Sequence, residues 1–151
     1  MIIRKATMND FDAVMNLENS CFKAPYHEAQ MKYEFNENPI NTILVVCDED
    51  KIAGFINFMT TFNSATITQI AVDKDYRKQG LATKLLNEME NTFAKSGEDV
   101  VEFVTLEVRK SNEPAICLYK KNGYEHVVNK KNYYPDGEDA VYMVKRVNTC
   151  Q

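Results

Sequence analysis

The sequence predicts an α/β fold in three layers, with four helices flanking a mixed, mostly antiparallel sheet of about seven strands. Three runs of apolar and β-branched residues lie between residues 42 and 72 and are joined by short turns, so they are expected to pair antiparallel. A helical segment over residues 78–95 separates the third run from the next strand, and a helix of this length permits a parallel crossover. These observations predict one parallel pair, between the fourth and fifth strands.

The predicted elements follow the order β-α-α-β-β-β-α-β-α-β-β along the chain. The first helix, over residues 11–21, is capped by Asn9 or Asp10 and has apolar residues at spacings of three and four. The last helix begins at Ser111 or Asn112, and Gly123 follows it where a left-handed C-cap belongs. The other helices are expected over residues 27–35 and 78–95, and the strands over 2–5, 42–47, 51–59, 65–72, 100–108, 124–128 and 140–144.

Size and composition favour a single globular domain over residues 1–151, with 44% hydrophobic and 26% charged residues. No apolar run approaches the ~20 residues of a membrane span, and the N-terminus lacks the apolar core of a signal peptide. The expected location is therefore the cytoplasm. A net charge of −4 argues against a nucleic-acid-binding surface as the main function.

The cysteines are widely separated, and the chain has only two histidines, so no metal site is expected. A lone cysteine is more often a small buried residue than a nucleophile. We expect this of Cys21, Cys47 and Cys117, with the terminal Cys150 as the exception.

The stretch between the fourth strand and the third helix has the pattern of an anion-binding site. Arg77, Gly80 and Ala82 stand in an Arg-x-x-Gly-x-Ala spacing at the start of an amphipathic helix. The first N–H groups of a helix have no intrahelical acceptor and carry partial positive charge. Gly80 has no Cβ, so a phosphate is able to approach the backbone closely. Taken alone, the pattern also fits an ordinary strand-to-helix connection.

Several stretches in a fixed order resemble the GNAT N-acetyltransferase superfamily over nearly the whole chain. The family's acetyl-CoA motif is similar to Ile70-Ala71-Val72 followed by Tyr76-Arg77-Lys78-Gln79-Gly80-Leu81-Ala82. Its second half resembles Leu106–Ala115, with Leu118-Tyr119 and Gly123-Tyr124 after it. The tail resembles the RimI-like branch, the ribosomal-protein-alanine N-acetyltransferases, in Lys131-Asn132-Tyr133-Tyr134, Glu138-Asp139-Ala140 and Met143.

The resemblance implies a GNAT-like sheet that is splayed between its fourth and fifth strands and holds acetyl-CoA as cosubstrate. Residues 70–72 are expected to pair their backbone with the pantetheine arm, and residues 78–83 to donate backbone N–H groups to the pyrophosphate. The residues that the resemblance assigns to acetyl-CoA are Ile70, Ala71, Val72, Lys78, Gln79, Gly80, Leu81, Ala82, Thr83 and Asn112.

The resemblance also assigns two catalytic roles. Glu107 is the expected general base, acting directly or through a water, and Tyr119 is the expected acid for the CoA thiolate. Outside such a family, a Glu near a strand end is usually solvated or paired, here with Arg109 or Lys110, and a Tyr at helical spacing is usually core. Members often carry an acidic residue on the fourth strand, where this chain has Ala65, Thr66 and Thr68.

The acceptor is expected to lie between an early loop and the final hairpin. Tyr26, at a position where members often have Trp, is expected to line a peptide groove with Tyr133 and Tyr134. Acidic residues in the hairpin, at 136, 138 and 139, favour a cationic peptide or are simply solvated. An α-amine, with a pKa of about 7.7–8.0, needs less help from a base than a lysine amine at about 10.4. A site with one carboxylate and no suitable His therefore favours an N-terminal amine.

The sequence thus predicts an acetyl-CoA-dependent N-acetyltransferase of a protein N-terminus, most specifically the N-terminal alanine of a small-subunit ribosomal protein. Two alternatives stay open: a GNAT enzyme acting on a polyamine or aminoglycoside, and a non-catalytic CoA-binding module. Neither the breadth of acceptor specificity nor the oligomeric state follows from the sequence.

Overall fold

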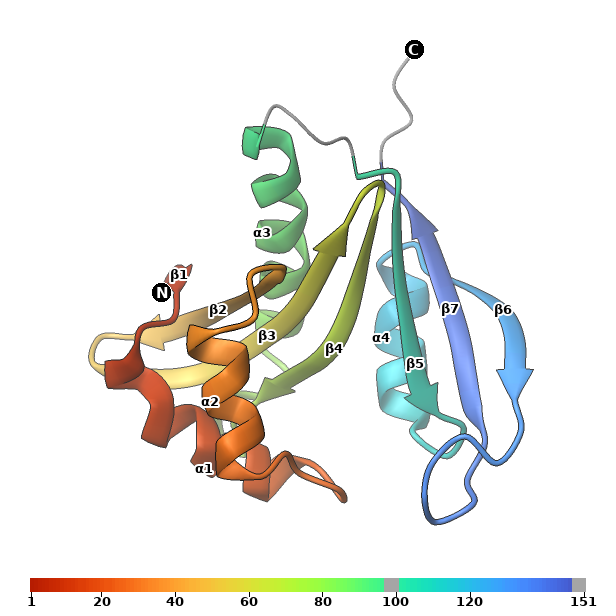
Figure 1. Cartoon of the computed structure of the whole chain (residues 1–151), viewed down its shortest axis with the longest axis horizontal. Helices are drawn as coiled ribbons and strands as arrows, with labels where there is room; N and C mark the ends of the chain where they lie inside the picture. Colours follow the sequence, from red (N-terminus) through yellow and green to blue (C-terminus); the bar gives the residue numbers. More distant parts are fainter. Residues whose placement is uncertain (97–100, 148–151) are drawn as a thin grey trace.

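The computed structural model describes residues 1–96 and 101–147, which form a seven-stranded sheet in the order β1-β2-β3-β4-β5-β7-β6 (Figure 1). The strands are β1 (Ile2–Lys5), β2 (Asn41–Asp48), β3 (Lys51–Thr61), β4 (Ser64–Val72), β5 (Phe103–Arg109), β6 (Glu125–Lys130) and β7 (Ala140–Arg146). The helices in these residues are α1 (Phe11–Cys21), α2 (Glu28–Asn36), α3 (Leu81–Ser96) and α4 (Glu113–Lys121). None of these helices is long and apolar enough to cross a membrane.

Strands β4 and β5 are parallel, and the other neighbouring strands are antiparallel, as the sequence predicted. The β4–β5 pairing is short, because it runs only from Ser64 opposite Phe103 to Ile67 opposite Leu106. Beyond these residues the two strands diverge (Figure 1). The rest of β4, from Thr68 to Val72, therefore presents an edge to which β5 does not pair.

Two hydrophobic clusters cover the sheet from opposite sides. Helices α1 and α2 pack on one face through a cluster that includes Phe11, Met31 and Phe55. Helices α3 and α4 pack on the other face, where Leu85 and Met89 of α3 are fully buried. The spacing of four residues along α3 thus directs its apolar stripe to the sheet.

A β-bulge at Thr68 reverses the faces of β4 where the strands diverge. Asn57 of β3 lies opposite Gln69 and the next residue lies opposite Ile67, so Thr68 has no partner of its own in the register. Before the bulge, Ile67 points toward the α3 side; after it, Ile70 does so, and Gln69 turns toward α1. A bulge inserts one residue and re-aims the side chains that follow it.

Several element boundaries differ from the prediction by one to three residues, most clearly the starts of α3 and β5. Helix α3 begins at Leu81 rather than at residue 78, because Lys78 and Gly80 have φ values of 63° and 78°, which a right-handed helix excludes. Strand β5 begins at Phe103, and residue 100 of the predicted strand lies outside the described residues. In the sequence, Ser96-Gly97 is expected to end the third helix, and Gly97 also lies outside the described residues.

Two smaller expectations are wrong. Asp10 precedes α1, but its carboxylate accepts hydrogen bonds from Arg4 and from the Thr7 backbone instead of capping that helix. Cys117 is exposed on α4, whereas Cys47 is buried as expected, Cys21 is half-buried and Cys150 lies outside the described residues. The side of α4 that packs on the core is formed by Ala115, Ile116 and Tyr119, so Cys117 faces water.

Candidate active site

A cavity of about 860 Å³ is lined by β4 and β5 beyond the point where they diverge. The α1–α2 loop, the turn before α3, the first turns of α3 and α4, and the β6–β7 loop contribute its other walls. Gln79 and Tyr133 are absent from its lining. The predicted site residues that do line it are Tyr26, Ile70, Ala71, Val72, Lys78, Gly80, Leu81, Ala82, Thr83, Glu107, Asn112, Tyr119 and Tyr134.

The turn before α3 is shaped to bind an anion. Its left-handed residues, Lys78 and Gly80, bring successive backbone N–H groups together, and the first hydrogen bond of α3 runs from the Lys84 N–H to the Gly80 carbonyl. The N–H groups of residues 81–83 precede that bond and face no intrahelical acceptor. A Cβ on Gly80 would meet no atom within 4 Å, so it would project into open space where a phosphate would lie.

The free edge of β4 forms a second wall of the cavity, and Arg77 fastens one end of it. The Arg77 Nε donates to the Val72 carbonyl at 3.1 Å, and its Nη2 lies 3.7 Å from the Cys21 Sγ. Arg77 therefore ties the turn to the strand and to the end of α1. The Arg77 guanidinium is therefore engaged in contacts that shape the site. The backbone N–H groups that follow Arg77 are the candidate donors to an anion.

Glu107 lies on the sheet face opposite α4. Its neighbours in β5, Leu106 and Val108, belong to the cluster under α3 and α4, and strand alternation directs Glu107 to the other side. The Glu107 Oε2 accepts a hydrogen bond of 2.6 Å from the Lys130 Nζ at the end of β6. The prediction that Glu107 pairs with Arg109 or Lys110 is thus wrong. Strand β7 lies between β5 and β6, and this order brings Lys130 of β6 to Glu107.

Arg109 instead organises the β6–β7 loop. Its Nη1 donates to Asp136 and to Glu138, at 2.9 Å and 2.8 Å, and its guanidinium lies 4.1 Å from the ring centroid of Tyr134. Hydrogen bonds from Ser111 and Arg109 lower the pKa of Glu138 to about 2. The acidic residues of the hairpin therefore hold the loop and, through Tyr134, one wall of the cavity.

Tyr119 is buried in α4, with 6% of its surface exposed, and also lines the cavity. Its ring packs edge-on against Tyr124 at a centroid distance of 5.6 Å. Burial raises the pKa of the Tyr119 hydroxyl well above its ordinary value, because a phenolate would be poorly solvated there. Tyr119 is thus a core residue, as its helical spacing predicts, and it also faces the cavity.

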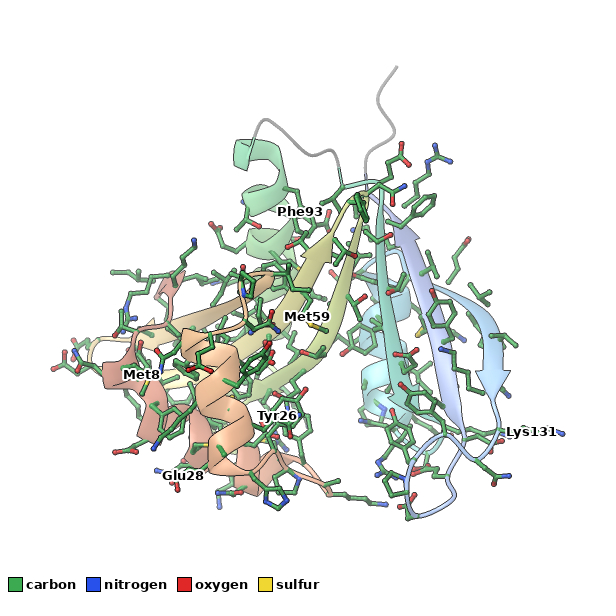
Figure 2. All side chains as sticks on the ribbon, viewed as in Figure 1. Met8, Tyr26, Glu28, Met59, Phe93 and Lys131 are labelled. Carbon is green, nitrogen blue, oxygen red and sulfur yellow. The ribbon has the colours of Figure 1, made fainter. Side chains whose placement is uncertain are left out.

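Tyr26 also lines the cavity, and a buried glutamate that the sequence reasoning missed holds it in place. Glu18 is fully buried, and its Oε2 accepts hydrogen bonds from the Tyr26 N–H and the Gln69 Nε2. Figure 2 shows Tyr26 beside the end of β4. Glu18 lies four residues after Val14 and three before Cys21, so a carboxylate on the apolar stripe of α1 was the available signal.

Asn112 caps α4, because its side chain accepts a hydrogen bond from the Ala115 N–H at 3.3 Å. Tyr133 packs edge-on against Tyr134 at 5.1 Å and is 47% exposed, so it lies outside the cavity wall. The candidate anion site before α3 thus shares one cavity with Glu107, Tyr119, Tyr26 and Tyr134.

Comparison with known proteins identifies the class. The model of the acetyltransferase (GNAT) family matches residues 11–124, and the chain belongs to that family. It is accordingly an N-acetyltransferase that uses acetyl-CoA, and the cradle around Gly80 fits the phosphates of that cosubstrate.

The similarity extends to particular members. The chain is 35% identical over 137 residues to the [ribosomal protein bS18]-alanine N-acetyltransferase of Escherichia coli, and the match covers 89% of each chain. The crystal structure of the ribosomal-protein-S18-alanine N-acetyltransferase from Escherichia coli superposes with a TM-score of 0.87 at 30% identity, covering 99% of this chain and 96% of that one. Arabidopsis thaliana NAA60 in complex with acetyl-CoA shares the fold, with a TM-score of 0.86 at 19% identity over 97% of this chain and 98% of that one.

Proposed function

We propose that this enzyme acetylates the N-terminal α-amine of a protein, and that its main acceptor is the N-terminal alanine of a small-subunit ribosomal protein. The name of the similar Escherichia coli enzyme supports the acceptor. The observation that supports this chemistry is that Glu107, Tyr119 and the candidate anion site before α3 line the same cavity. We also propose that the enzyme works in the cytoplasm, where ribosomal proteins are made.

Binding of acetyl-CoA is assigned to the backbone of two segments. The N–H groups from Lys78 to Thr83 would hold the pyrophosphate, and the unpaired edge of β4 at Ile70–Val72 would hold the pantetheine arm as a neighbouring strand does. The thioester supplies an acetyl group that is activated toward an amine. Gln79 belongs to the same turn, and Asn112 lines the far wall of the cavity.

Glu107 is proposed to accept the proton that the acceptor amine loses. Its carboxylate is on the sheet face opposite α4, and it lines the cavity together with Tyr26 and Tyr134. A carboxylate is a weak base for a lysine ammonium but sufficient for an α-amine, whose pKa is about 7.7–8.0. The proton transfer is direct or passes through one water.

Tyr119 is proposed to donate the proton that the departing thiolate takes. Because burial raises its pKa, the phenol stays protonated at neutral pH, which is the form that a donor needs. Its place in the lining of the cavity, which the edge of β4 also lines, supports this role. Tyr26 and Tyr134 are proposed to enclose the first residues of the peptide, with Tyr133 supporting Tyr134 from outside the cavity.

A panel of peptides that differ only in their first residues tests the proposed acceptor. Each peptide is incubated with the enzyme and acetyl-CoA, and the released CoA thiol is measured. We expect turnover with peptides that begin with alanine, and little with the same peptides blocked at the α-amine. Equal or greater turnover with free polyamines or aminoglycosides would replace the proposal with a small-molecule acceptor. CoA binding without any turnover would indicate a binding module.

A further inference from the structure

The Lys130 ammonium is held in a site built for a cation. Its Nζ lies 2.6 Å from the Glu107 Oε2, 4.7 Å from the ring centroid of Tyr142 and 5.4 Å from that of Tyr133. A carboxylate with aromatic faces around it is the usual environment of a bound ammonium group. Glu107 and Tyr142 are direct partners across β5 and β7, so the sheet itself fixes this arrangement.

Arg109 and two carboxylates of the adjoining β6–β7 loop are paired with one another. Arg109, two residues after Glu107, donates to Asp136 and Glu138 of the β6–β7 loop. Tyr134 stacks on Arg109, and burial raises its pKa to about 12, so it is neutral at physiological pH. The ion pair beside the proposed base is therefore that between Glu107 and Lys130. The hydrogen bond to Glu107 raises the pKa of Lys130, which keeps the lysine charged.

We propose that Lys130 is a positioning residue for the acceptor amine: in the free enzyme its ammonium occupies the place beside Glu107 that the acceptor takes, and its charge selects an acceptor that is neutral there. The inference rests on the proposed role of Glu107. The side chain of Lys130 is 39% exposed, so it has room to move aside while remaining nearby. Lys130 would then be a specificity-determining residue rather than a reacting one.

The reason is the repulsion between like charges. An acceptor that keeps its proton places a second ammonium beside Lys130. With the effective dielectric constant typical of a protein surface, the repulsion between the two charges lowers the pKa of the bound acceptor by about one unit. An α-amine tolerates this, because it loses its proton near neutral pH. A lysine side chain, with an ordinary pKa of about 10.4, stays charged and is repelled. Lys130 thus favours protein N-termini over lysine side chains.

The test compares Lys130→Met with Lys131→Met. Lys131 is the next residue, and Figure 2 shows its side chain directed away from the sheet. The kcat–pH profile is measured with one alanine peptide, because this profile reports ionisations of the bound complex. We expect Lys130→Met to move the acid limb up by about one pH unit, to lower kcat at pH 7 up to about tenfold, and to lower the peptide KM. Lys131→Met is expected to keep the wild-type profile.

Two further measurements separate charge from structure. Lys130→Arg keeps the charge and should keep the wild-type acid limb. In the wild-type enzyme, about 1 M salt should move the limb in the same direction as Lys130→Met, because it screens the repulsion. This salt experiment remains decisive if Lys130→Met fails to fold, which thermal unfolding and acetyl-CoA affinity would reveal.

The outcomes distinguish this inference from the proposed function. An active wild-type enzyme whose acid limb and peptide KM are the same in Lys130→Met, or whose limb does not respond to salt, would overturn the role of Lys130 alone. A wild-type enzyme that releases no CoA with alanine peptides would instead overturn the proposed acceptor.

Discussion

The two halves of the sheet are stabilised in different ways. Strands β2 to β4 lie between two hydrophobic clusters, one under α1 and α2 and one under α3 and α4, and β1 contributes only Ile3, to the second of them. Among the described residues, β5 and β7 contribute only to the second cluster, and β6 contributes to neither. Their other face carries ion pairs, such as Lys130 with Glu107 and Arg109 with Glu138. Residues of β6 are nearly all exposed.

The difference matches what each half contributes to the cavity. The β1–β4 half presents backbone groups, which need a rigid support and little side-chain chemistry. The β5–β7–β6 half contributes the Glu107 carboxylate and, from α4 and the β6–β7 loop, Tyr119 and Tyr134, and its uncovered face leaves room for an acceptor. Exposed ion pairs contribute little to stability, typically about 0–1 kcal/mol each. The charged side chains on this face are therefore able to act in binding and catalysis at little cost to the stability of the fold.

The largest expected effect on stability lies in the doubly covered half. Phe55→Ala removes a fully buried ring in β3 and should lower the free energy of unfolding by about 3–5 kcal/mol, measured by urea denaturation. Val127→Ala in β6 is the control, since Val127 is 58% exposed, and it should change stability by less than about 0.5 kcal/mol. Equal losses in both variants would contradict the comparison.

The second prediction concerns activity in the other half. Glu107→Gln should lower kcat by about 10²–10³-fold, most strongly at low pH where the neutral amine is scarce, while stability changes by less than about 1 kcal/mol. Steady-state kinetics across pH and thermal unfolding measure the two effects. Glu125→Gln, an exposed change in β6, should leave both unchanged. A wild-type pH–rate profile in Glu107→Gln would exclude it as the base.

Replacing Glu18 should have an intermediate effect on stability, because Glu18 connects Gln69 of β4, in the doubly covered half, to the α1–α2 loop that carries Tyr26. Glu18→Ala leaves the Gln69 amide and the Tyr26 N–H without their buried acceptor and should cost about 2–3 kcal/mol. Faster hydrogen exchange at the Tyr26 amide and urea denaturation measure it. Asn19→Ala, on the exposed side of the same helix, is the matched control. Unchanged exchange at Tyr26 would show that the loop is held by other contacts.

The smallest effect is the pH dependence of the β6–β7 loop. The pKa of Glu138 is lowered from 4.5 to about 2, so its contribution to stability is complete above the unfolded value and is lost as the pH falls toward about 2. The Tm of the wild type should exceed that of Glu138→Gln above about pH 5, and the difference should disappear near pH 2. A difference that persists at pH 2 would indicate a contribution from packing rather than from charge.

The sequence predicted the order of elements and the parallel pair because both depend on local periodicity and on the length of one connecting helix. It misplaced the start of α3, because a basic, helix-forming residue such as Lys78 does not by itself signal the left-handed conformation that it adopts before Gly80. The residues of the candidate anion site were recognisable, since they are contiguous. The partner of Glu107 was not, because Lys130 is distant in sequence and arrives through the order β5-β7-β6.

The sequence by itself determined the backbone part of the cavity, where one turn and the helix after it supply the donors. Only the tertiary structure decided the side-chain part. The bulge at Thr68 turns Gln69 toward Glu18, which fixes the Tyr26 loop, and the pairing of β6 with β7 carries Lys130 to Glu107. The physical reason is that local patterns fix what each segment is, whereas contacts between distant segments depend on strand order and register.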